Sequence, residues 1–161
     1  MLYPSPLCLR AGEVERSPPP KRSIDAVLED LVKQLFDAIR ERDLDTFAAV
    51  VHENVELEVP YGEGVEPVIG RDAVLGMFGY VLGGMFDRLD LSITTVYPGR
   101  DDDAIVIEYQ GQANVVSTGR PYANRYIGVF RQRDDLISLW REYYNPLITA
   151  RAMTQSDSST K

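Results

Sequence analysis

The first regular pattern in the chain lies between Ser23 and Ile39. Its apolar residues recur at spacings of three and four, the period of an α-helix with one buried face. Ser23 is a residue type suited to the N-cap, and Asp25 lies in the first turn, where a negative charge is favourable. The sequence therefore predicts a long amphipathic helix. Its apolar positions are Ile24, Val27, Leu28, Leu31, Leu35 and Ile39.

Two more helices and one strand are predicted before the middle of the chain. The helical period restarts over residues 43–51, and residues 55–59 then alternate between apolar and polar as in a strand with one buried face. A loop rich in glycine and proline follows over residues 60–70. Residues 71–88 predict a third helix, and its glycines suggest a backbone that packs closely on a sheet.

The second half of the chain has the pattern of strands. Apolar and polar residues alternate in four segments separated by turn residues such as Pro98-Gly99 and Asp134-Asp135. The predicted strands cover residues 91–97, 104–116, 122–133 and 136–145. Helices followed by a run of hairpins predict an α+β domain, in which the helices cover the apolar face of an antiparallel sheet.

Both ends of the chain lack this patterning. Residues 1–22 contain several prolines and no apolar stretch of signal-peptide length, and residues 154–161 are rich in serine and threonine. We therefore expect two disordered tails around one domain at residues 23–153. The absence of a targeting signal implies a cytoplasmic protein.

Composition excludes several classes of function. The chain has 161 residues with a net charge of -8, and its cations are dispersed among acids, which argues against nucleic-acid binding. The longest uncharged apolar stretch, residues 73–86, is shorter than the roughly 20 residues that span a membrane. With one histidine and one cysteine, Cys8, neither an internal disulfide nor a His/Cys metal site is expected.

The strongest chemical signal is a carboxylate among aromatic residues in the last predicted strand. Alternation places Trp140, Glu142 and Tyr144 on the same face of that strand. A carboxylate between two rings loses water, which raises its pKa toward the range where general acid–base catalysis is efficient. Glu142 is therefore the candidate catalytic residue, and the proton transfer calls for neither a metal nor a cofactor.

The same hairpin resembles a known superfamily. Asn124-x-Tyr126, Phe130 and the run from Arg141 to Pro146 are similar to the closing hairpin of SnoaL-like proteins, a branch of the ketosteroid-isomerase-like (nuclear transport factor two-like) superfamily. Within that branch the pattern is closest to the phenazine-biosynthesis A/B proteins. The resemblance implies a cone-shaped barrel of strongly curved antiparallel sheet closed by three N-terminal helices, with a pocket inside.

The resemblance also has consequences for chemistry. The matching glutamate of the phenazine-biosynthesis proteins is an acid/base residue, and Glu142 stands in its place. The catalytic groups of the ketosteroid isomerases are absent, because Val59 replaces their base and Leu35 replaces their oxyanion-hole tyrosine. Gly128 stands where the phenazine-biosynthesis proteins have a histidine. Steroid isomerisation by that mechanism is therefore not expected, and phenazine chemistry is in doubt.

Together with the carboxylate among aromatic residues, the resemblance implies an enzyme of secondary metabolism that acts on a small aromatic or polycyclic carbonyl or imine compound. Proton transfer by Glu142 would drive cyclisation, condensation, isomerisation or dehydration. The first alternative is a non-catalytic small-molecule-binding protein or dimeric scaffold of the same fold. The second is hydrolase or monooxygenase chemistry on the same cone. The predicted substrate-binding residues are Asn124, Tyr126, Trp140, Tyr144, Tyr61, Tyr109 and Arg125.

An assembly is also predicted from the sheet. The family resemblance implies a homodimer through the outer face, and apolar residues on that face would form the interface. The residues expected there are Ile127, Val129, Ile137 and Leu139.

A structural role is the competing interpretation of Glu142. In that case its carboxylate would be the ion-pair partner of an arginine such as Arg125.

Overall fold

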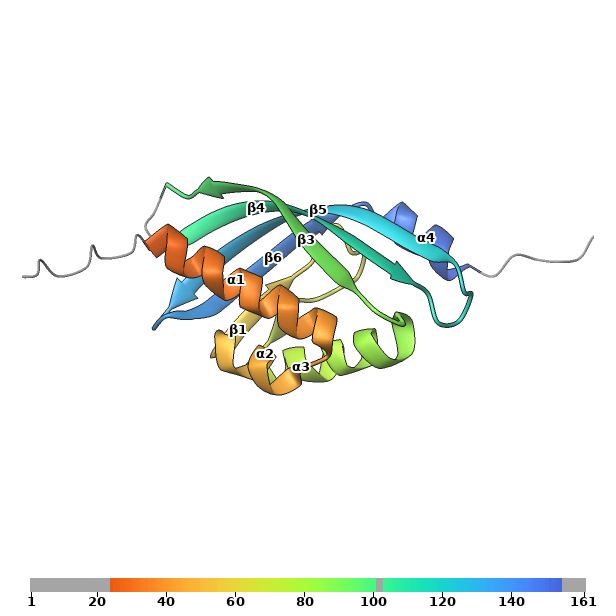
Figure 1. Ribbon diagram of the computed structural model, residues 1–161, viewed down its shortest axis with the longest axis horizontal. Coiled ribbons are helices and arrows are strands. Elements are labelled where there is room, and N and C mark those ends of the chain that lie inside the picture. Colours follow the sequence, from red (N-terminus) through yellow and green to blue (C-terminus); the bar gives the residue numbers. More distant parts are fainter. Residues whose placement is uncertain (1–23, 101–102, 155–161) are drawn as a thin grey trace, which may run out of the picture.

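The computed structural model describes residues 24–100 and 103–154; the predicted N-terminal tail and residues 155–161 of the C-terminal tail lie outside this part. The described chain forms helices and one mixed sheet (Figure 1). The helices are α1 (Ile24–Glu41), α2 (Leu44–Val50), α3 (Arg71–Tyr80), the π-helix η1 (Val81–Met85) and α4 (Pro146–Met153). The strands are β1 (Val51–Glu58), β2 (Val68–Ile69), β3 (Asp90–Pro98), β4 (Ala104–Asn114), β5 (Pro121–Arg133) and β6 (Leu136–Tyr144).

The six strands form a curved sheet in the order β2-β1-β6-β5-β4-β3, with α1, α2 and α3 covering one face (Figure 1). The predicted α+β class and the strongly curved sheet covered by three helices are confirmed, but the sheet does not form a barrel and is mixed instead of wholly antiparallel. The sheet is open, with β2 and β3 at its edges, and β1 pairs in parallel with β6. Parallel neighbours need a long connection, which here is supplied by everything from β2 to β5.

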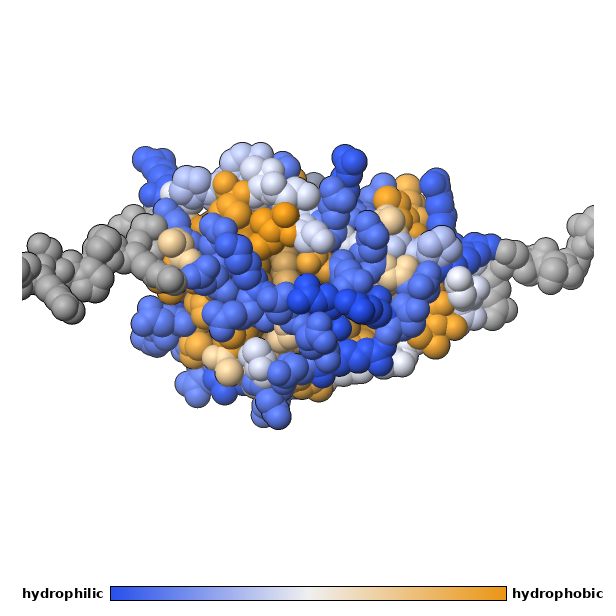
Figure 2. Space-filling view, in the orientation of Figure 1, coloured by the Kyte–Doolittle hydropathy of each residue, from blue (hydrophilic) through white to orange (hydrophobic). Residues whose placement is uncertain are grey.

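Helix α1 provides much of the core, as its apolar period predicted. Its residues Leu28, Val32, Leu35 and Ile39 have no exposed surface, and the helix contacts β3, β4, β5 and β6. Each such side chain stabilises the fold by roughly 1.5–3 kcal/mol relative to an exposed one. The opposite side of α1 is hydrophilic, and apolar surface shows along the border between the helix and the sheet (Figure 2).

Three elements differ from the sequence prediction. The predicted third helix ends at Tyr80 and continues as η1, and its glycines do not pack on the sheet: a Cβ at Gly76, Gly79 or Gly83 would meet no atom within 4 Å. Strand β2 lies in the predicted loop. Helix α4 was not predicted, although Asn145-Pro146 is a helix-start signal: the Asn145 side chain accepts a 3.0 Å hydrogen bond from the Leu147 N–H.

An irregularity in the last hairpin changes which residues face outward. The register between β5 and β6 shifts after Arg131, so that Ile137 is fully buried together with Trp140. The prediction that Ile137 lies on the outer face is therefore wrong, because strict alternation does not survive a β-bulge. Beyond the bulge the alternation holds, and Trp140, Glu142 and Tyr144 share the inner face as predicted.

Within the described residues no helix is long and apolar enough to cross a membrane. The same part of the chain contains no group of three His, Cys, Asp or Glu side chains placed to hold a metal ion.

Candidate functional site

Glu142 forms a hydrogen bond with a tyrosine two strands away, on the inner face of the sheet. Its carboxylate accepts a hydrogen bond from the Tyr109 hydroxyl, which comes from β4, while Glu142 belongs to β6. The indole Nε1–H of Trp140 lies 3.4 Å from the same hydroxyl oxygen and donates to it. Strand β5 runs between them and contributes Gly128 directly opposite Glu142. The three side chains form one buried polar group.

Burial sets the protonation chemistry of this group. The Glu142 residue keeps some exposed surface, but its carboxyl lies among rings, and burial raises its pKa from 4.5 to about 7 against the opposing effect of the Tyr109 hydrogen bond. The pKa of Tyr109 is raised well above its ordinary value, first by burial and then by the negative charge of Glu142. Glu142 can therefore both accept and release a proton near neutral pH.

A second polar cluster stands beside the first. Tyr126 stacks on Tyr109, with ring centroids 4.8 Å apart and planes within 5°, and its hydroxyl is in short contact with the Tyr122 hydroxyl. Asn124 Nδ2 donates to the Tyr122 hydroxyl at 3.2 Å and to the Asn145 carbonyl at 3.0 Å. Burial raises the pKa of Tyr126, so this phenol stays neutral and can donate.

One O–H of the second cluster is left without an acceptor. The Tyr122 and Tyr126 hydroxyls share one hydrogen bond in which either group can donate, and Tyr122 also accepts from Asn124. When Tyr122 donates, the Tyr126 O–H is free to donate to a ligand, and no acceptor for it is found among residues 24–100 and 103–154. Tyr122 was missed in the sequence analysis, although alternation from Asn124 and Tyr126 along the same strand would have placed it on this face.

Aromatic rings surround both clusters. Trp140 packs against Phe78 and Phe130, with centroids 5.3 and 5.7 Å away, and Phe36 of α1 lies 4.8 Å from the Tyr109 ring. Along β6 the inner face changes from the buried Trp140 to the half-buried Tyr144, and Glu142 lies between them. The carboxyl is thus next to the part of this face that solvent reaches.

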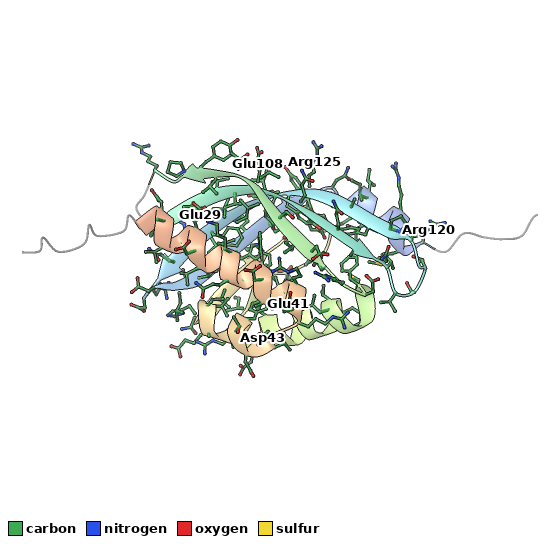
Figure 3. All side chains as sticks on the ribbon, in the orientation of Figure 1. Glu29, Glu41, Asp43, Glu108, Arg120 and Arg125 are labelled. Atoms are coloured by element: carbon green, nitrogen blue, oxygen red, sulfur yellow. The ribbon has the colours of Figure 1, made fainter. Side chains whose placement is uncertain are left out.

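Two of the predicted substrate-binding residues lie elsewhere. Arg125 and Glu108 are on the side of the sheet away from α1 (Figure 3), and Tyr61 packs edge-on against the outward Tyr143 with centroids 5.4 Å apart. Glu142 faces the other side, so the structure does not bring it together with Arg125. The interpretation of Glu142 as the ion-pair partner of Arg125 therefore has no geometric support.

A groove of about 800 Å³ lies on this outer face. Outward residues of β3 to β6 line it, and Tyr109, Tyr126 and Tyr144, whose rings contact one another on the inner side, also border it. The Arg125 side chain is exposed there and forms no ion pair with any described residue. The outward lining residues are Tyr61, Thr94, Glu108, Gln110, Arg125, Ile127 and Tyr143.

The model of the SnoaL-like domain matches residues 32–140, more than half of the chain. This chain belongs to the SnoaL-like domain family. The match ends at Trp140, two residues before Glu142. Among curated proteins, YesE of Bacillus subtilis (strain 168), described as uncharacterized, is 29% identical over 136 residues, which cover 82% of this chain and 90% of YesE.

Solved structures place this SnoaL-like protein in the same fold family. A Bacillus subtilis protein described as a "putative isomerase" is 24% identical, with a TM-score of 0.71, over 80% of this chain and 94% of that chain. A phenazine biosynthesis-related protein of Pseudomonas aeruginosa is 17% identical, with a TM-score of 0.70, over 86% of this chain and 92% of that chain. At these identities the likeness establishes the fold.

Other structures of this fold hold small organic molecules. TerC was co-crystallised with polyporic acid; it is 13% identical, with a TM-score of 0.68, over 78% of this chain and 97% of that chain. Rv0760c of Mycobacterium tuberculosis was solved with estradiol-17beta-hemisuccinate; it is 18% identical, with a TM-score of 0.65, over 76% of this chain and 96% of that chain. Each of these two proteins was thus solved together with a small organic compound.

Proposed function

We propose that this protein is a cofactor-independent enzyme of secondary metabolism. Its substrate would be a small aromatic or polycyclic carbonyl or imine compound, and Glu142 would transfer the proton. The observation that carries the proposal is the Glu142 carboxyl, which lies among aromatic rings, has a pKa of about 7 and accepts a hydrogen bond from Tyr109. A general acid–base residue is most effective when its pKa is close to the working pH.

The proposed mechanism uses both polar clusters. The Glu142 carboxylate removes a proton from the carbon next to the carbonyl or imine, and the electron pair moves onto the oxygen or nitrogen. The Tyr126 O–H, held by Tyr122 and Asn124, donates to that atom and stabilises its developing charge. Glu142 then returns the proton at another position, giving isomerisation, or the enol attacks within the substrate, giving ring closure.

The surrounding rings would bind the substrate. Trp140 and Tyr144 flank Glu142 on the same strand, and flat aromatic faces at a half-buried site suit planar ligands with a polar edge. The ring-containing ligands of TerC and Rv0760c support this class of substrate. Tyr61 and Arg125 line the outer groove together with Tyr109, Tyr126 and Tyr144, and their own side chains lie on the side of the sheet away from Glu142.

We further propose a homodimer formed through the outer face. The groove on that face carries exposed apolar surface, including Tyr61 at 62% and Ile127 at 46% exposure. It also carries charges of both signs, Glu108 and Arg125, which a two-fold axis can set against each other in the two copies. A self-complementary patch of this kind is what an isologous interface requires.

A non-catalytic binding or scaffold role is the second candidate. The observation in its favour is the close packing of Phe36, Phe78, Phe130 and Trp140, which leaves the inner half of the domain filled with rings. In that case Glu142 would only hydrogen-bond a ligand. The two candidate functions differ in one measurable property: the enzyme would transfer protons to and from a carbon atom of its ligand, and the binding protein would not.

Hydrogen exchange with solvent tests the proposed enzyme without knowledge of its natural reaction. Aromatic ketones, cyclic 1,3-diketones and imines are incubated with the protein in D₂O, and deuterium at carbon is measured by mass spectrometry. We expect protein-dependent exchange of at least one compound, and Glu142→Gln should slow it roughly 10²-fold or more. Exchange at the same rate in Glu142→Gln would exclude Glu142 as the base, and binding without exchange would favour the second candidate.

A further inference from the structure

Gly128 lies where an ordinary side chain would block the Tyr109–Glu142 hydrogen bond. Gly128 pairs with Ile107 on β4 and with Glu142 on β6, and Tyr109 is the next inward residue of β4. Adjacent strands are about 4.8 Å apart, so the two partners are joined across the whole width of β5. A phenol can bridge that distance only by lying over β5.

The geometry at position 128 shows that the ring does so. A Cβ built on Gly128 would lie 3.0 Å from Tyr109 Cε1 and 2.6 Å from Phe130 Cε2. Real Cβ atoms essentially never approach within 3.0 Å of a neighbouring heavy atom, so at least one ring would have to move. Gly128 does not have a positive φ, unlike Gly64, Gly70 and Gly119, so space rather than backbone conformation explains this glycine.

The Tyr109 ring has little freedom to yield. Tyr126 stacks on it at 4.8 Å, and Phe36 of α1 packs against it, also at 4.8 Å. With these two neighbours fixed by the core, displacement by a new methyl group would carry the hydroxyl away from Glu142. Close-packed protein interiors transmit such shifts to neighbouring side chains instead of absorbing them.

We propose that Gly128 is a positioning residue, whose missing side chain lets Tyr109 cross β5 and hold the carboxyl of Glu142. The catalytic relevance of Gly128 rests on the proposed function, whereas the contacts around Gly128 do not depend on any reaction. The titratable group that acts on Glu142 is Tyr109, through its hydrogen bond. The Tyr126 and Tyr144 side chains lie on the same face of the neighbouring strands. Removal of the Tyr109 bond would take away the contact that lowers the pKa of Glu142.

The test measures the Glu142 pKa by NMR titration of protein carrying ¹³C-labelled glutamate side chains, with Glu142→Gln used to assign the signal. We expect Gly128→Ala to raise the pKa by about one unit, and Tyr109→Phe to raise it by a similar amount. The double variant should show no further rise, because both changes remove the same bond. An unchanged pKa in Gly128→Ala, or additive shifts in the double variant, would overturn the proposal.

A second pair of variants covers a failure of Gly128→Ala to fold. Phe130→Leu removes the ring responsible for the 2.6 Å contact and leaves only the conflict with Tyr109. The double variant Phe130→Leu/Gly128→Ala is then compared with Phe130→Leu alone. We expect the pKa of Glu142 to be higher in the double variant by about the same amount, and an unchanged pKa would overturn the proposal. The measured quantity is the pKa of Glu142, which does not depend on any reaction. If this pKa shifts as expected but the wild type catalyses no hydrogen exchange with solvent, the positioning role of Gly128 holds and only the enzymatic function is rejected.

Discussion

Both faces of strands β4, β5 and β6 carry charged and tyrosine side chains, but these side chains differ in burial and in hydrogen bonding. On the inner face Glu142 and Tyr109 are hydrogen-bonded to each other, and burial raises the pKa of both. On the outer face of the same strands, Arg125 is exposed in an open groove without an ion pair to any described residue. The Glu108 carboxylate there accepts a long, 3.4 Å contact from the Tyr97 hydroxyl and no other hydrogen bond from a described residue.

The environment, and not the residue type, distinguishes the candidate catalytic carboxylate from Glu108. Both glutamates lie on long strands of one sheet, and each is followed directly by a tyrosine in the sequence. Only Glu142 points toward the helices that exclude water. If the account is right, identical substitutions on the two faces should have very different effects.

The largest difference is expected for the removal of one tyrosine hydroxyl. Tyr126→Phe deletes the donor proposed to stabilise charge on the substrate, and should slow solvent exchange by about 10²-fold. Tyr143→Phe makes the same chemical change on the outer face and should alter the rate by less than about twofold. Mass-spectrometric exchange rates compare the two variants, and equal losses would remove the distinction between the faces.

A smaller difference is expected in stability. The folded-state pKa of Glu142 is raised above its ordinary value of 4.5, so its ionisation costs stability as the pH rises from about 4.5 through about 7. Glu142→Gln removes this cost while keeping the acceptor for Tyr109. At pH 8 the variant should be more stable than the wild type by up to about 3 kcal/mol, and at pH 4 the two should be equal.

Urea unfolding at both pH values measures this difference. Glu108→Gln is the matched control on the outer face, and should leave the change in stability between pH 4 and pH 8 as it is in the wild type. A Glu142→Gln protein that is less stable than the wild type at pH 8 would mean that the charge holds the structure together, as the ion-pair interpretation requires.

The smallest effect concerns assembly. Arg125→Glu places a second acid beside Glu108 in the groove, and should weaken a dimer formed through this face by about tenfold in Kd or more. Arg133→Glu reverses a charge on the same strand outside the groove and serves as the control. Analytical ultracentrifugation measures both; a monomeric wild type at micromolar concentration would reject the outer face as a dimer interface.

Much of the fold could be predicted because periodicity reports which side of an element is buried. The apolar spacing of α1 and the alternation of β4 and β5 correspond to the buried sets that the structure contains. The parallel pairing of β1 with β6 could not be predicted, since it depends on contacts between strands about 80 residues apart. Ile137 was misplaced because the bulge beside it leaves no mark in the composition of the strand.

The candidate site was predictable in part for the same reason. Alternation placed Trp140, Glu142 and Tyr144 on one face, and the resemblance singled out Glu142. Tyr61 and Arg125 were predicted from residue type, which carries no information about the side of the sheet, and their part in substrate binding stays a prediction. The role of Gly128 was not visible either, because a glycine in a strand becomes informative only when the ring above it is known.

The central claim is that the Glu142 carboxyl is half protonated near neutral pH inside this domain. Isotope-edited infrared spectroscopy follows the protonated and ionised carboxyl bands of the wild type as a function of pH, and subtraction of the Glu142→Gln spectrum isolates this residue. We expect a titration centred at about pH 7 in the wild type that is absent from Glu142→Gln. A Glu142 carboxyl that is fully ionised by pH 6, with a midpoint near its ordinary 4.5, would contradict it.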